Sequence, residues 1–176
     1  MASRRSIVAN APASAVAAAS VALVLGVLYA AVSAYWGSGG TALLDTVGGA
    51  FQRAGRTGGA GLIAVVWVTV LLKLLAAILG FVAVVGRPRL AAARRRLVQR
   101  PAWAAALMLI LYGGALSITG WLVQLGVVSA AANADQKALR WHAFLWDPWF
   151  LVWGLLLAVG LVRSRRSRAA LPLVAR

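Results

Sequence analysis

A single lysine stands inside an otherwise apolar run, in the segment LLKLL at residues 71–75. A lone ammonium in hydrocarbon costs about 3 kcal/mol, so Lys73 needs either a partner or a function. Asp147 is also a charged residue within an apolar run, in the segment WDPW at residues 146–149. The simplest chemistry for the two residues is an intramembrane ion pair.

Few reactions fit the remaining inventory of side chains. The chain has no cysteine, a single histidine and three acidic residues. These counts exclude disulfides, thiolate chemistry and histidine-rich metal sites. His142 and Asp147 are five residues apart, which is not one α-helical turn, and no serine is placed as a nucleophile. We therefore expect no enzyme, no cofactor and no metal.

The chain is too hydrophobic for a soluble domain, since 62% of its 176 residues are hydrophobic and 12% are charged. Four runs reach the length of about 20 residues that a membrane-spanning helix requires: 13–36, 61–85, 102–130 and 143–162. The sequence predicts an all-α, integral membrane, four-helix transmembrane bundle over residues 13–162. Short tails remain at residues 1–12 and, strongly basic, at 163–176. A cleaved signal peptide is the alternative reading of the N-terminus, but its apolar run is longer than such peptides have.

Arginines explain the formal net charge of +15 without a nucleic acid. They cluster before the first span, between the second and third, and after the fourth. The positive-inside rule then places both termini and the middle loop in the cytoplasm, as in a multi-pass protein of the bacterial inner membrane. Arginines at that face also attract anionic lipids. The expected partners are the bilayer and its anionic lipids, with a homo-oligomer or a membrane protein partner as a further option and no nucleic acid.

Depth along the helices places Lys73 and Asp147 at a similar level. Counting from the cytoplasmic boundaries puts them about 10 Å and about 6 Å below the outer boundary. Tryptophans crowd the same level, which is typical of an aromatic belt but also fits an outer pocket. The residues of that predicted pocket are Lys73, Asp147, His142, Trp146, Trp149 and Gln124.

Several local boundaries follow from helix signals. Asp147 followed by Pro148 predicts a helix that starts at or just before Asp147. Residues 91–99 predict a short helix bounded by Pro88 and Pro101. Residues 43–53 and 133–141 are read as short helices in the two outer connections, the second capped by Asn133 or Asp135. Small residues at every fourth position predict a close-packed face on the first span: Ala18, Ala22, Gly26, Ala30 and Ala34.

The segment LRWHAFLWDPWFLVWG at residues 139–154 is the most specific motif of the chain. Together with YWG at 35–37, GGT at 39–41, LDTVGG at 44–49, LK at 72–73 and YGG at 112–114, it resembles a family of small bacterial four-helix membrane proteins. That family is catalogued only as a domain of unknown function. The resemblance implies four spans, with a short outer connection before the last, and implies no activity.

Two functions fit this reading. The favoured one is a non-catalytic, membrane-embedded binding or accessory protein. In it the Lys73–Asp147 pair either locks the bundle or receives an anionic or amphipathic, lipid-like ligand. The alternative is a subunit of an oligomeric small-solute or ion transporter or channel, with Lys73 as an anion or proton site.

Overall fold

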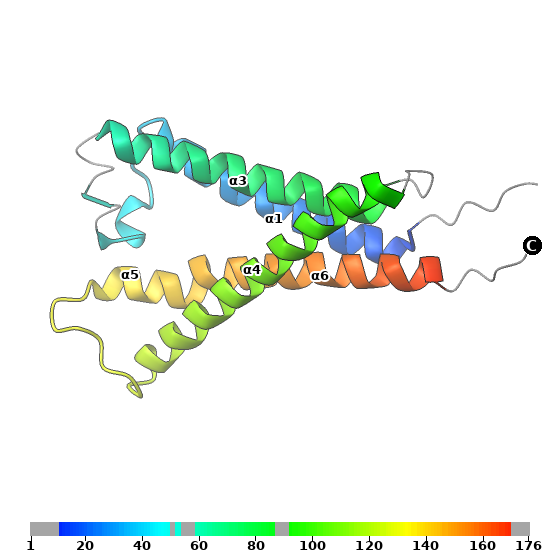
Figure 1. Ribbon diagram of the computed structural model, residues 1–176. Coiled ribbons are helices and arrows are strands. Elements are labelled where there is room, and N and C mark those ends of the chain that lie inside the picture. The colour runs from blue at the N-terminus through cyan, green and yellow to red at the C-terminus, as the bar shows by residue number, and fades with distance from the viewer. Residues whose placement is uncertain (1–10, 50–51, 54–58, 87–91, 170–176) are drawn as a thin grey trace, which may run out of the picture.

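The computed structural model describes residues 11–49, 52–53, 59–86 and 92–169 and is all-helical over them (Figure 1). Four helices are long and apolar enough to cross a membrane: 13–37, 60–85, 96–124 and 136–167. The first two are α1 (Ala13–Gly37) and α3 (Ala60–Val85). These two helices begin and end within one residue of the apolar runs at 13–36 and 61–85.

The third helix, α4 (Ala92–Gln124), differs from its prediction at both ends. It runs through Pro101, which therefore does not separate a loop helix from the span; Pro88 lies outside the described residues. Proline removes only the hydrogen bond to the carbonyl of Leu97, a residue that is 73% exposed, so water can replace it. At the other end Gly126 has φ +73°, and the Val127 N–H donates to the Leu122 carbonyl, closing a Schellman motif. The helix stops there rather than at residue 130.

The last span is built in three pieces: α5 (Gln136–Trp141), the π-helical turn η2 (His142–Trp146) and α6 (Asp147–Ala169). The predicted helix start at Asp147 is therefore wrong. The start lies eleven residues earlier, where the Asp135 side chain accepts hydrogen bonds from the backbone N–H groups of Lys137 and Ala138. This Asp135 cap was one of the two expected for residues 133–141.

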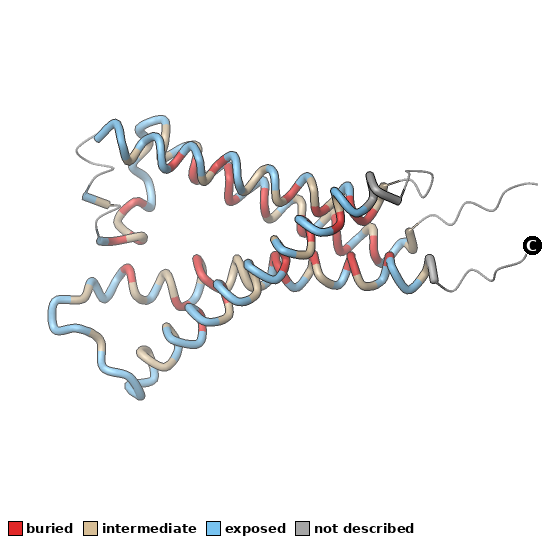
Figure 2. Tube along the Cα trace, in the orientation of Figure 1, coloured by how far each residue is buried: buried red, intermediate tan, exposed pale blue. Residues whose placement is uncertain are grey.

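The bundle is organised as two tight helix pairs. α1 packs most extensively against α3, and α4 packs against α6, crossing it obliquely in Figure 1. Buried residues follow the lines where the helices meet, whereas the outward faces are exposed (Figure 2). The core is made of small residues of α1, such as Ala19 and Ala22, against large ones of α6, Trp153, Leu157 and Leu161.

Most of the predicted small-residue face of α1 lies inside the bundle. Ala18, Ala22, Gly26 and Ala30 are buried, whereas Ala34 is half-buried. A Cβ added at Gly26 would lie 2.5 Å from Cζ2 of Trp153 and 2.7 Å from Cβ of Ala77. Only glycine allows α1, α3 and α6 to meet there, and such close packing at small residues is typical of membrane helices.

Candidate functional site

A π-helical turn brings together the two polar residues that an α-helix would keep apart. The Asp147 N–H donates to the His142 carbonyl, five residues earlier, rather than to the residue four before it. Pro148 follows directly and has no N–H for the ordinary helical bond, so a widened turn at this point disrupts less than it would elsewhere. The extra residue places the His142 and Asp147 side chains on the same side of the last span.

His142 and Asp147 form a hydrogen-bonded dyad. Nδ1 of His142 lies 3.2 Å from Oδ1 of Asp147, and Nε2 lies 3.3 Å from the carbonyl oxygen of Val47. A carbonyl only accepts, so the ring can donate its Nε2–H to Val47 while Nδ1 faces the carboxylate. Asp147 is only 5% exposed, so this polar partner lowers the cost of burying its carboxyl group.

The connection between α1 and α3 folds over this dyad. Its short helix η1 (Leu44–Thr46) has two buried residues, Leu44 and Thr46. The indole Nε1 of Trp146 donates to Oγ1 of Thr46 at 3.1 Å. Lys137 of α5 forms a hydrogen-bonded salt bridge with Asp45 at the surface. We call residues 38–48, α5 and η2 the loop end of the molecule; all three acidic side chains of the chain lie within it or directly beside it.

Lys73 has other partners than the predicted one. Its Nζ donates to Oγ of Ser33 at 2.6 Å and lies 4.3 Å from the centre of the Tyr29 ring, both on α1. Among the described residues no ion pair joins Lys73 to Asp147, whose partner is His142. Matching depth along two helices leaves open which way each side chain points around its helix, and here they point to different neighbours. The ammonium therefore joins α3 to α1.

Several aromatic residues of this level pack on one another. Tyr29 stacks on Trp146, with ring centres 5.7 Å apart, and contacts Trp149 at 5.3 Å and Phe150 at 4.6 Å. Trp149 donates its Nε1 to the Leu25 carbonyl at 3.1 Å. Of the predicted pocket residues, the structure joins His142, Asp147 and Trp146 around the π turn and places Trp149 against α1. Gln124, at the last residue of α4, has no side-chain hydrogen bond within the described part of the chain.

Three residues of this site were not predicted from the sequence. Ser33 and Tyr29 are one turn apart beside the small-residue face of α1, a spacing that could have marked them as partners for a buried lysine. Val47 contributes only its backbone carbonyl, for which the sequence holds no signal.

A groove of about 340 Å³ lies between α3 and α4, and Phe150 and Trp153 of α6 also line it. Its lining is apolar except for Thr69 and Lys73, and the Nζ of Lys73 is bonded to α1. The buried Nε1 of Trp153 has no hydrogen-bond acceptor within the described residues. Helical neighbours supply most of the remaining lining: Leu72, Leu75, Ala76 and Leu79 of α3, and Ala105, Met108 and Leu109 of α4.

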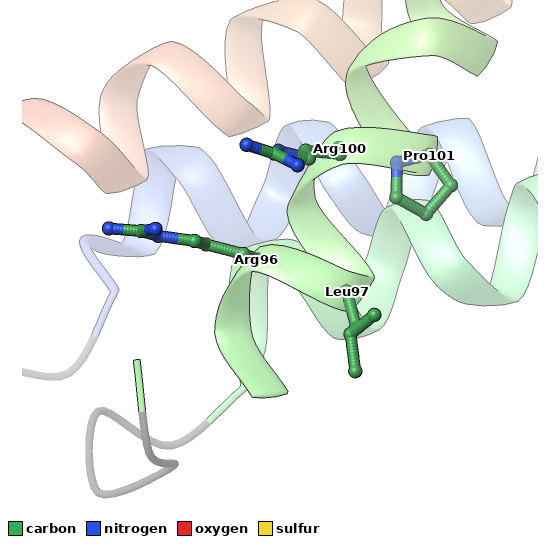
Figure 3. A pocket seen from close by; sticks show the side chains of 4 residues that line it. All are labelled: Arg96, Leu97, Arg100 and Pro101. Atoms are coloured by element: carbon green, nitrogen blue, oxygen red, sulfur yellow. The ribbon is translucent and has the colours of Figure 1, made fainter. Parts of the chain in front are cut away.

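A second pocket, of about 380 Å³, lies at the opposite end of the bundle from the loop end. It is lined by Arg96, Leu97, Arg100 and Pro101, and Figure 3 shows both guanidinium groups extending to the same side of α4. Nearby, the Arg165 guanidinium of α6 lies 4.7 Å from the Trp103 ring centre and donates to Oε1 of Gln99 at 3.4 Å. We call this region, residues 96–103 of α4 with residues 163–167 of α6, the arginine end.

Neither region has the side chains of a metal centre, since no described group of three histidine, cysteine or acidic residues lies together. Fold and site thus define a class: all-helical proteins with four helices long and apolar enough to cross a membrane. Within that class, residues 26–157 match the model of the family described as "Protein of unknown function (DUF3995)". The match covers more than half of the chain, so the chain belongs to this family. Neither the curated proteins nor the solved structures contain a significant match to it.

Proposed function

We propose that the chain is a multi-pass protein of the bacterial inner membrane, with both termini in the cytoplasm, that binds a lipid-like, amphipathic ligand without transforming it. The observation that carries the proposal is the groove between α3 and α4. Its volume of about 340 Å³ is within the range of small-molecule sites. Its lining suits a hydrocarbon chain.

The surface around the groove supports contact with lipid. In the most apolar window of α3 only 17% of the residues are buried within the bundle. Leu71 and Met108, on the two helices that form the groove, are 64% and 71% exposed. A surface this apolar is stable only when it is covered, and lipid chains cover it in a membrane. The groove would then open sideways to the acyl chains.

The His142–Asp147 dyad supports a non-catalytic role. In a nucleophilic triad the second ring nitrogen of the histidine faces a hydroxyl or thiol. Here Nε2 of His142 faces the carbonyl of Val47 instead. The nearest hydroxyl on that segment, Thr46 Oγ1, donates to the Leu43 carbonyl and accepts from Trp146. In this proposal the dyad holds the connection between α1 and α3 against the last of the four long helices.

Native mass spectrometry of the protein purified from its own membrane in mild detergent tests the proposal. The groove is filled by Ala105→Phe, and the matched control is Ala104→Phe, at an exposed neighbour that does not line the groove. We expect a retained amphiphile in the wild type and the control and at least a tenfold loss in Ala105→Phe, about 1.4 kcal/mol of binding energy. A bare protein in all three samples would overturn the proposal, and a bare oligomer would favour the transporter or channel alternative.

A further inference from the structure

The groove between α3 and α4 and the arginine pocket share one lining residue, Pro101. We call the two together the furrow. Leu97, Pro101, Ala105 and Met108 follow one another at steps of three or four residues, which places them along one face of α4. A single elongated ligand can therefore lie along this face, from the arginine end towards the centre of the bundle.

The arginine end supplies an anion site at the mouth of the furrow. Arg96 and Arg100 are one helical turn apart, are exposed, and extend to the same side of α4, whereas the Leu97 and Pro101 side chains lie on the other side in that view (Figure 3). The chain has only three acidic side chains, and all of them belong to the loop end. Within the described residues neither guanidinium has an acidic partner. A guanidinium in this position binds phosphate oxygens well, because it is planar, permanently charged and has several donors.

The dimensions of the furrow fit one leaflet. The seven steps from Pro101 to Met108 rise about 10 Å along α4. The hydrocarbon of one leaflet is about 15 Å thick, half of a core of about 30 Å. Lys73 borders the inner end of the groove, midway along α3, with its ammonium bonded to Ser33. In this proposal the furrow begins with arginine side chains at the membrane surface. Its apolar part is long enough to hold most of an acyl chain.

We propose that this furrow binds an anionic phospholipid of the leaflet on the arginine side. The phosphate of the lipid lies between Arg96 and Arg100, and one acyl chain lies in the groove beside Ala105 and Met108. Leu97 and Pro101 contact the start of the chains. This inference rests on the proposed function, because it names the class of ligand that the groove takes and adds the site for its headgroup.

The test is lipid retention by the full chain in native mass spectrometry, after delipidation and addition of phosphatidylglycerol or phosphatidylcholine. Arg96→Gln/Arg100→Gln removes two charges from the mouth. Arg163→Gln/Arg166→Gln removes two exposed charges from the same end of the bundle outside the pocket, and is the matched control. We expect phosphatidylglycerol to be retained over phosphatidylcholine, with about a tenfold or greater loss in the mouth variant and little in the control. Unchanged unfolding temperatures would show that both variants are folded.

The outcomes separate the headgroup site from the groove. If Ala105→Phe loses phosphatidylglycerol but the mouth variant keeps it, the groove binds lipid and the headgroup assignment is wrong. Equal loss in the mouth variant and the control would also overturn it, because it would show a general charge effect. If Ala105→Phe keeps phosphatidylglycerol while Arg96→Gln/Arg100→Gln loses it, the groove proposal fails and a surface lipid site remains. Displacement of the lipid by excess inorganic phosphate would make a free anion the ligand and overturn the lipid assignment.

Discussion

The two ends of the bundle treat their charges in opposite ways. At the loop end each acidic side chain has a partner within the chain: Asp45 pairs with Lys137, Asp135 caps α5, and Asp147 bonds to His142. At the arginine end Arg96 and Arg100 have no acidic partner among the described residues. Satisfied polar groups hold a fold in one arrangement, whereas exposed charges without partners gain energy only when something binds. The loop end is therefore structural, and the proposed binding belongs to the pocket that Arg96 and Arg100 line at the arginine end.

Lys73 illustrates why this distinction matters. From the sequence it was expected to be either half of a lock or a ligand-binding residue. The structure gives it a neutral hydrogen-bond acceptor and an aromatic ring on α1. The Asp147 carboxyl group has His142, rather than the lysine, as its partner. Lys73 thus belongs with the contacts that hold α1 against α3, and the groove beside it is the proposed binding site.

The largest effect at the loop end is expected when the buried Trp146 loses its acceptor. Thr46→Val keeps the shape of the side chain but leaves the indole N–H of a 2% exposed tryptophan without a hydrogen bond. We expect a cost of about 2 kcal/mol in the free energy of unfolding, measured by denaturant titration in detergent. Thr41→Val, at an exposed position of the same connection, is the control. If both variants cost the same, the connection is not held by this bond.

A smaller effect is expected at the surface of the same end. Asp45→Asn breaks the salt bridge to Lys137, whose side chain is 55% exposed while that of Asp45 is 42% exposed. Such pairs contribute about 0.5 kcal/mol, and less at high salt. Unfolding of wild type and variant at low and high ionic strength would show this. A loss as large as that of Thr46→Val would mean that the surface bridge, rather than the buried bonds, fastens the connection.

The sequence predicted most of the fold because length and hydropathy are strong signals. The apolar runs predicted the positions of α1 and α3. The side-chain chemistry of Asp135 predicted the cap of α5. The site was harder to predict for a physical reason. Two residues five apart lie on different sides of an α-helix but on the same side of a π turn. The residue types of His142 and Asp147 alone do not predict that turn. Depth likewise matched Lys73 with Asp147 but could not give the rotation of each helix.

The hydrogen-bond partner of Asp147 is His142 and not Lys73. Two double-mutant cycles on the free energy of unfolding measure which of the two residues is coupled to Asp147. One cycle combines His142→Ala with Asp147→Ala; the other combines Lys73→Met with Asp147→Ala. We predict a coupling of about 2 kcal/mol in the first cycle and less than about 0.5 kcal/mol in the second. Strong coupling of Lys73 with Asp147, together with additive losses for His142 and Asp147, would contradict the account and restore the intramembrane ion pair.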